Sequence, residues 1–298
     1  MSGKVLLLAL CALALAVPAA EPAARPVRIL LAISGNGTSS LLTSSDGVRF
    51  GAPVASWAGS QPAPVRRGSI LYVYDRPTLN ADGLSGTVHR FAVGAGGSLA
   101  EKAAVPYTVQ LGSPEDAARA TAGSFAPSFA VDENGLLVLL YSLRFEPATN
   151  ACPVTGQACV KLRTATEVSG SDGTTFAGDP GNRVVISVAP AATLGPPALF
   201  RTATGWAALL RGPAGCLHLL TGRDLRGKYE DGCVAHLSPG SPSALWGPAV
   251  REYRLYGVVG GRVVRMVSRR LGTVVTRRFR PLDVAGRPAF ARVAANMP

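Results

Sequence analysis

Near its C-terminal end the chain reads Arg287-Pro288-Ala289-Phe290-Ala291-Arg292-Val293, a proline followed by a short apolar strand. The same block occurs four times earlier, and there a tight turn and a second apolar strand follow it. These four copies start around Pro62, Pro127, Pro197 and Pro242. Internal repetition of this kind is typical of folds built from similar units in a ring or a stack.

A second block, an apolar strand leading into a polar hairpin, follows each first block. Its clearest copies carry Ser45-Asp46-Gly47 before Phe50 and Ser171-Asp172-Gly173 before Phe176. Asp-Gly between apolar runs is a tight-turn signal. Looser copies cover residues 88–99, 217–229 and 263–274. The main run thus has five second blocks but four first blocks, so the stretch at Arg287 supplies the one that is missing at the start.

The repeat count therefore predicts an all-β, five-bladed β-propeller with four antiparallel strands in each blade. The C-terminal strand, residues 287–293, is expected to pair with the N-terminal hairpin that begins near Val27 and so to close the ring. Closure also removes exposed strand edges, which promote aggregation. A two-sheet sandwich or two separate β domains would leave this terminal strand unexplained. Residues 27–298 are predicted to form a single domain.

The N-terminal residues have the features of an export signal. Lys4 precedes an apolar run over residues 5–17, and small residues stand at a cleavage site near Ala19 or Ala20. Residues 1–20 are predicted to be a signal peptide and residues 21–26 a short linker. The apolar run is short for a membrane span, which needs about 20 residues, although an uncleaved anchor is the alternative. We expect a secreted or periplasmic protein with no transmembrane segment in the mature chain.

Cysteine content agrees with export, because four cysteines remain beyond the signal peptide: Cys152, Cys159, Cys216 and Cys233. Cys216 and Cys233 flank a hairpin centred on residues 224–227, so they are expected to face each other across two strands. Cys152 and Cys159 would then close a short loop. The alternative is a zinc site, but the spacing lacks the close cysteine pairs that such sites use.

The chain is strongly basic, with a formal net charge of +12 and a pI near 10.1. Residues 251–298 hold eleven arginines against Glu252 and Asp283. This excess indicates either an anionic partner or a solvated surface of arginine-rich strands. Because aromatic residues do not alternate with these arginines as they would in a single-strand binder, nucleic acid is not the expected partner.

The repeated blocks resemble those of the five-bladed glycoside hydrolases of family 43 and its relatives in families 32, 62 and 68. The best match is the stretch from Ala126 to Gly135. The resemblance implies catalytic carboxylates near the starts of the innermost strands, an Asp before Pro and a Glu before Gly-Pro. Here Leu194 precedes Gly195-Pro196, and none of the residues before the prolines of the first blocks is acidic: Gln61, Ala63, Ala126, Gly195, Ser241 and Arg287. Since glycoside cleavage normally needs two carboxylates, we expect a protein without this catalytic activity.

Long connections over residues 75–86, 100–124, 145–159 and 178–195 are expected on one face of the ring, which would then be the binding face. Asp75 and Glu146 both follow second strands. They are either a carboxylate pair for acid–base chemistry or loop partners of the neighbouring arginines.

Arg76, Arg144 and Arg211 occupy similar exits from second strands. Three guanidinium groups on one rim are predicted to bind carboxylate, sulfate or phosphate groups, the alternative being that they only keep the loops soluble. The three histidines are scattered and no phosphate-binding loop is present, so neither a metal nor a cofactor is predicted.

The sequence thus predicts an exported, monomeric propeller that binds an extracellular glycan or anionic polymer without cleaving it. A diverged glycoside hydrolase with loop carboxylates and a structural protein of the cell envelope are the alternatives.

Overall fold

The computed structural model describes residues 28–94, 98–113, 118–121, 126–192, 194–235, 239–271, 279–284 and 288–297. The predicted signal peptide and linker, as well as Arg287, lie outside the described residues. Apart from two short 3₁₀ turns, Pro147–Thr149 and Pro213–Gly215, the named elements are strands. Among the described residues no helix has the length and apolar character needed to cross a bilayer.

The strands of the described residues form three four-stranded sheets and one eleven-stranded sheet, which we divide at its parallel contact between β13 and β8. We call the resulting units blades 1 to 5 and name the strands of each from the centre outward. Blade 1 contains β23 (Phe290–Met297), β1 (Arg28–Gly35), β2 (Thr38–Ser44) and β3 (Ala55–Ala58). Blade 2 contains β4 (Ala63–Arg67), β5 (Ile70–Tyr74), β7 (Gly83–Val93) and β8 (Leu99–Gln110), and β6 (Thr78–Asn80) pairs with β7.

Blade 3 contains β10 (Ser128–Val131), β11 (Leu137–Phe145), β12 (Ala158–Glu167) and β13 (Thr175–Gly178), and it carries β9 (Ala120–Thr121) and β14 (Val184–Val188) as additions. Blade 4 contains β15 (Ala198–Arg201), β16 (Trp206–Arg211), β17 (Leu217–Gly222) and β18 (Glu230–Ala235). Blade 5 contains β19 (Gly240–Gly247), β20 (Glu252–Val259), β21 (Arg262–Ser268) and β22 (Arg280–Pro281). A short parallel pairing of β13 with β8 joins blades 2 and 3 into one sheet.

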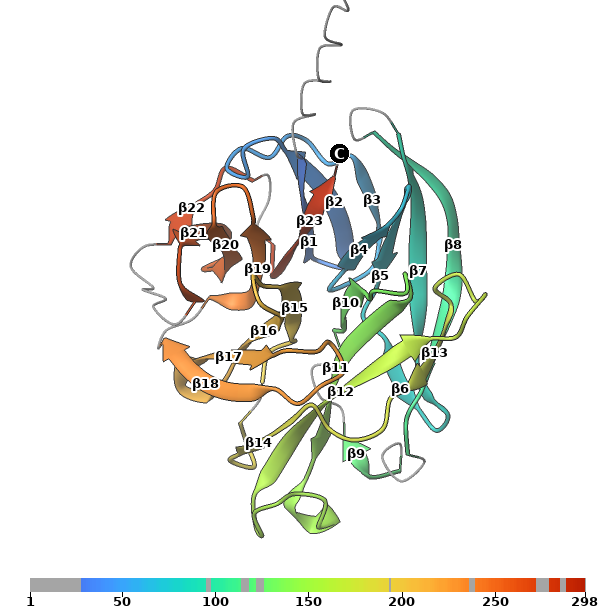
Figure 1. Cartoon of the computed structure of the whole chain (residues 1–298), viewed down its shortest axis with the longest axis vertical. Helices are drawn as coiled ribbons and strands as arrows, with labels where there is room; N and C mark the ends of the chain where they lie inside the picture. Colours follow the sequence, from blue (N-terminus) through green and yellow to red (C-terminus); the bar gives the residue numbers. More distant parts are fainter. Residues whose placement is uncertain are drawn as a thin grey trace, which may run out of the picture.

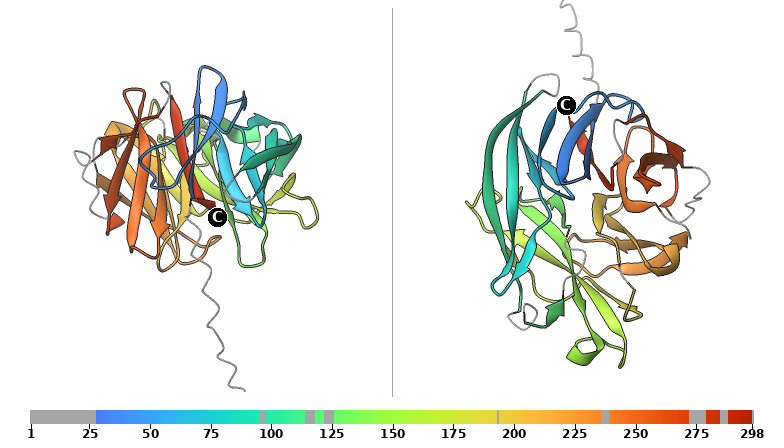
Figure 2. Two further views of the ribbon diagram at one scale, coloured as in Figure 1. Left: turned by 90° about the horizontal axis from the view of Figure 1, so that it is seen from above. Right: turned by 180° about the vertical axis from the view of Figure 1, so that it is seen from behind.

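The innermost strands surround a common centre (Figure 1), and the sheets stand side by side around it when the molecule is turned (Figure 2). Strand β23 contacts β4 and β19, and β10 and β15 complete the circle. The predicted closure is confirmed, because β23 pairs with β1 in an antiparallel register that places Val293 opposite Leu31 and Phe290 opposite Ser34.

Five hydrophobic clusters fill the interfaces between neighbouring blades, one cluster at each interface. Strand β1 shows how this arises from sequence. Leu30 packs against blade 2, whereas Leu31 faces blade 5, and both are fully buried. A strand between two blades has no solvent-facing side, so its sequence is continuously apolar instead of alternating.

Tyrosines of two second strands hydrogen-bond to the Asp-Gly turn of the next blade, from blade 2 to blade 3 and from blade 5 to blade 1. The Tyr74 hydroxyl donates to the Gly173 carbonyl at 2.9 Å, and the Tyr256 hydroxyl donates to the Gly47 carbonyl at 3.1 Å. At both glycines a positive φ permits the turn, and an added Cβ would lie 2.6 Å from the tyrosine oxygen. The repeated Tyr and Asp-Gly blocks therefore form contacts between blades, and the Tyr256 contact links the last blade to the first.

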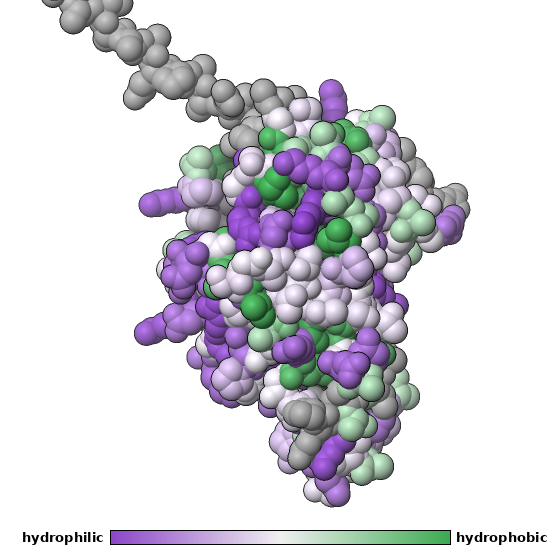
Figure 3. Space-filling model, turned by 90° about the vertical axis from the view of Figure 1, so that its right-hand side faces the viewer, coloured by the Kyte–Doolittle hydropathy of each residue, from purple (hydrophilic) through white to green (hydrophobic). Residues whose placement is uncertain are grey.

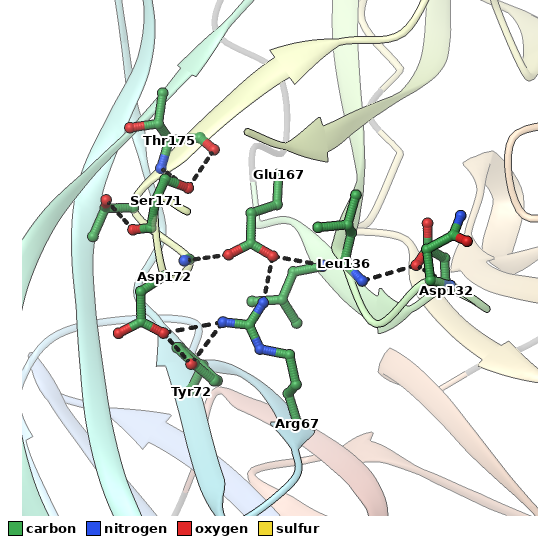
Figure 4. A network of polar contacts seen from close by, with 12 residues as sticks. Arg67, Tyr72, Asp132, Leu136, Glu167, Ser171, Asp172 and Thr175 are labelled. Carbon is green, nitrogen blue, oxygen red and sulfur yellow. Dashed lines mark hydrogen bonds and ion pairs between the residues drawn. The ribbon is translucent and has the colours of Figure 1, made fainter. Parts of the chain in front are cut away.

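A buried ion-pair network reinforces the contact between blades 2 and 3 (Figure 4). Glu167 is 4 % exposed and accepts from Arg67 Nη1 at 2.5 Å. Its carboxylate also accepts from the backbone N–H groups of Gly173 and Leu137, at 2.5 and 2.9 Å. Asp172, in the turn beside Gly173, accepts from the Tyr72 hydroxyl at 2.6 Å. This set satisfies a carboxylate that would otherwise be costly to bury.

The predicted long connections contain strands. Residues 78–80 form β6, residues 100–110 belong to β8, and residues 184–188 form β14. The outermost strand of a blade faces solvent on one side, so it needs few apolar residues and its sequence resembles a loop. On the side of the molecule where β8 lies, hydrophobic surface occurs in small separate groups among hydrophilic residues (Figure 3).

Candidate functional site

A cavity of about 690 Å³ lies at the centre of the ring, and the innermost strands of all five blades contribute to its wall. The middle and C-terminal parts of these strands line it, and it reaches the turns that follow β4, β15 and β19 at Gly68, Ala203 and Pro248. Its size is within the usual range for small-molecule sites. The cavity therefore extends toward the face of the short first hairpins, whereas the predicted binding face lies at the opposite ends of the strands.

Arg292 of β23 closes the inner end of the cavity. Its side chain is buried, with Nη2 donating to the Pro197 carbonyl at 2.8 Å and Nη1 donating to the Pro127 carbonyl. Burial lowers the pKa of Arg292 to about 9, which still leaves the guanidinium charged at neutral pH. Arg292 thus joins the starts of three innermost strands and places a positive charge at the bottom of the cavity.

Two serine hydroxyls brace the same region. Ser128 Oγ accepts from the backbone N–H of Leu199 at 2.8 Å, and Ser243 Oγ accepts from that of Val293 at 3.2 Å. Neighbouring innermost strands converge at the centre without pairing along their length, so their backbone groups need side-chain partners. These contacts keep the strands that line the cavity at a defined separation.

The wall on the side of blades 4 and 5 is aromatic. Trp206 and Trp246 are both half-buried and line the cavity. The Trp246 ring packs on Tyr253 with centroids 4.5 Å apart, which holds its orientation. The Arg201 guanidinium lies 5.4 Å from the centroid of the Trp206 ring. Aromatic faces of this kind can pack against the C–H face of a sugar ring, while a neighbouring cation binds its polar substituents.

The charged residues of the lining all have the same sign. Arg66, Arg201 and Arg292 line the cavity, and no Asp, Glu or His is among the described lining residues. In a mostly apolar pocket, the few polar groups fix the orientation of the ligand and determine which ligand is bound. The cavity is therefore suited to a partly apolar ligand with acceptor or anionic substituents.

Asp75, a predicted candidate for catalysis, is enclosed elsewhere between blades 1 and 2. Both of its carboxylate oxygens accept from Trp57 Nε1 at 3.1 Å, and Oδ2 lies 3.2 Å from His89 Nε2. Gly59 closes over it, since an added Cβ would lie 2.6 Å from both carboxylate oxygens. This carboxylate has partners for both oxygens and does not line the cavity.

Glu146 follows β11 in blade 3, and its Oε1 accepts from Arg144 Nε at 2.7 Å. Asp75 follows β5 in blade 2, and no described contact brings the two carboxylates together. The contact between Glu146 and Arg144 corresponds to the second of the two predicted roles, that of a loop partner for a neighbouring arginine. An acid–base role for either residue stays a prediction.

Arg76 comes after β5 in blade 2, whereas Arg144 and Arg211 lie within the last two residues of β11 and β16 in blades 3 and 4. All three are at the ends of the blades away from the cavity mouth. Arg76 and Arg211 are exposed. Arg144 is buried and donates to the carbonyls of Ala192 and Pro190 as well as to Glu146. Its guanidinium therefore braces the connection to blade 4, and ligand binding by this set stays a prediction.

Both expected disulfides are confirmed. Cys152 pairs with Cys159 and Cys216 with Cys233, with Cα atoms 5.6 and 5.8 Å apart. The first closes the end of the β11–β12 hairpin, and the second joins the start of β17 to β18. No cluster of three or more metal-ligating side chains occurs among the residues described here.

His89 lies between two carboxylates, since its Nδ1 is 3.1 Å from Glu101 Oε1 and its Nε2 faces Asp75. Burial disfavours the charged form, but the hydrogen bonds to Asp75 and Glu101 outweigh burial and raise the pKa of His89 above 6.5. A group with a raised folded-state pKa stabilises the fold below its unfolded-state pKa, and this stabilisation is lost as pH rises through the folded-state pKa.

We therefore expect the urea midpoint of the protein to fall as pH rises from below 6.5 through the pKa of folded His89. The His89→Gln variant should lose this part of the pH dependence. Parallel urea titrations at several pH values measure the difference between the two proteins. If the difference in urea midpoint between the two proteins were the same at every pH, protonation of His89 would not be coupled to folding.

Sequence reasoning missed the cavity residues Arg66, Arg201, Trp206, Trp246 and Arg292. A signal was present for three of them. Trp206 and Trp246 both border the turn of a first block, and Arg292 is a charged residue within an otherwise apolar innermost strand. Only the circular arrangement of the blades brings these positions together.

The sequence matches no protein-family model and no curated protein sequence. Among solved structures, an engineered family 43 glycoside hydrolase with endo-xylanase and exo-arabinofuranosidase activity superposes with a TM-score of 0.54 at 12% identity, over 92% of this chain and 53% of that chain. This chain has the fold of the family 43 propellers. It spans about half the length of that enzyme.

Two further glycoside-cleaving enzymes match with TM-scores of 0.48 at 11% identity. A family 117 glycoside hydrolase from Zobellia galactanivorans matches over 80% of this chain and 70% of that chain. An endo-arabinase from Bacteroides thetaiotaomicron matches over 82% of this chain and 93% of that chain. The likeness to the family 43 fold concerns architecture, and the cavity residues described above come from this chain alone.

Proposed function

We propose that this exported propeller binds a glycan in its central cavity and does not cleave it. The observation that carries the proposal is the composition of the cavity, which combines Trp206 and Trp246 with three arginines and has no described carboxylate in its lining. Sugar rings are bound by aromatic faces and by donors to their hydroxyl groups, whereas glycoside cleavage requires a pair of carboxylates about the scissile bond.

The chain has three tryptophans, and two of them line the cavity. In a Trp57→Phe variant the remaining tryptophan fluorescence comes from Trp206 and Trp246 only. We expect titration with the correct oligosaccharide to change this fluorescence saturably. A panel of oligosaccharides, with chromatography of the same mixtures to detect hydrolysis products, separates binding from turnover.

Replacing Trp206 and Trp246 together by alanine should weaken binding by at least about 100-fold, because buried tryptophans dominate the energy of such contacts. Calorimetry measures the affinity, and Trp57→Phe is the matched control that should retain it. Hydrolysis abolished by Asp75→Asn or Glu146→Gln would instead support a diverged glycoside hydrolase. Failure of every oligosaccharide to bind would support a structural role in the envelope.

A further inference from the structure

We infer that the cavity ligand is an acidic saccharide whose carboxylate or sulfate group is bound by Arg201 beside Trp206. This inference rests on the proposed function and names the ligand class and the site of the charged group. Arg201 is the last residue of β15, and it is exposed at the turn that reaches the cavity mouth.

The orientation of Arg201 favours binding of an anionic group. Its guanidinium lies over the Trp206 ring, 5.4 Å from the centroid, and both residues line the cavity. Stacking orders the arginine side chain before a ligand arrives, which reduces the entropy lost on binding. A ligand that packs on the aromatic wall would therefore have its acidic substituent next to a pre-oriented guanidinium.

Two acidic side chains close to lining residues are paired with arginines outside the lining. Asp132, directly after Val131 of the lining, accepts from Arg226 Nη2 at 2.6 Å and from two backbone N–H groups. Glu167 accepts from Arg67, the neighbour of Arg66. Glu133 is exposed in the β10–β11 turn and is not in the lining.

Because Asp132 and Glu167 are paired with arginines outside the lining, they do not neutralise the positive charge of the lining arginines. Arg66 and Arg201 are on blades 2 and 4, and Arg292 lies at the inner end of the cavity. Three cations at three positions around a partly enclosed space produce a positive potential, which is focused by the low-dielectric wall. An anionic ligand gains from this potential, whereas a neutral sugar does not.

The Trp57→Phe protein is titrated with three oligosaccharides of equal length: a neutral one, a uronic acid counterpart and a sulfated counterpart. We expect at least one acidic oligosaccharide to bind tenfold or more tightly than the neutral one at low salt. The difference should shrink as salt rises, because exposed charge interactions are screened. Comparison of the uronic acid and sulfated oligosaccharides shows whether the cavity binds a carboxylate or a sulfate group.

Arg201→Gln should weaken binding of the acidic oligosaccharide by about tenfold or more and that of the neutral one much less, because the glutamine amide can still donate to a hydroxyl group but carries no charge. Arg211→Gln removes the same charge at the opposite end of blade 4 and is the matched control. Loss of affinity in Arg211→Gln and not in Arg201→Gln would overturn the inference and place the anion on the rim predicted from sequence. Equal affinity for neutral and acidic oligosaccharides would also overturn it while leaving glycan binding intact, whereas absence of all binding would remove the proposed function itself.

Discussion

A chain that ends at Pro288 is expected to lose the cooperative unfolding transition of the full-length protein and to aggregate. The deletion removes β23, which pairs with β1 and contributes the buried residues Phe290, Ala291 and Val293. It also removes Arg292, which donates to two other innermost strands. Strand β1 would then expose an apolar edge at the centre of an open ring. Circular dichroism during urea titration and size-exclusion chromatography measure the effect.

A circular permutant is the matched control for this deletion. Arg28 and Met297 are paired residues of β1 and β23, so a short Asn-Gly turn can join these strands. The chain would be opened at Gly260-Gly261, in the turn between β20 and β21, where both glycines have positive φ. The permutant keeps every strand and should unfold cooperatively. Native-like unfolding of the truncated monomer would contradict closure as the source of stability.

Replacement of Glu167 by alanine should lower the free energy of unfolding by about 3 to 5 kcal/mol, the usual cost of breaking a buried ion pair. The variant leaves Arg67 without its buried partner and leaves the N–H groups of Gly173 and Leu137 without an acceptor. Blades 2 and 3 meet at this carboxylate, so the loss acts on the interface between them. Urea denaturation measures the change.

Asp172→Asn is the control for Glu167→Ala. Asp172 belongs to the same network, but its side chain is 58 % exposed, and exposed ion pairs contribute about 1 kcal/mol or less. A loss in Glu167→Ala no larger than that in Asp172→Asn would mean that the buried carboxylate does not hold the blades together.

The closure of the ring could be predicted because it depends on a repeat with one block displaced to the far end of the chain. The disulfide pairing followed from local geometry, since Cys216 and Cys233 flank one hairpin and Cys152 and Cys159 close another. Strand β8 was taken for a loop, because an outermost strand with one solvated face carries no strong apolar pattern.

The predicted site residues show where sequence reasoning stopped. Asp75 and Arg144 were considered for a site because they stand near the ends of equivalent strands, but their partners come from other segments. Trp57 and His89 meet Asp75, and the carbonyls of Pro190 and Ala192 meet Arg144. The insertions indicated the end of the ring opposite to the cavity, since loop length carries no information on where the innermost side chains leave space. Ligand binding at the insertion face stays a prediction.

The sequence alone thus determined the strand repeat, the hairpins and the junction of the two ends, because these follow from periodicity and turn chemistry over short distances. The tertiary structure alone decided that Arg66, Arg201, Trp206, Trp246 and Arg292 line one space. These residues belong to four different blades, and only the circular arrangement brings their side chains together.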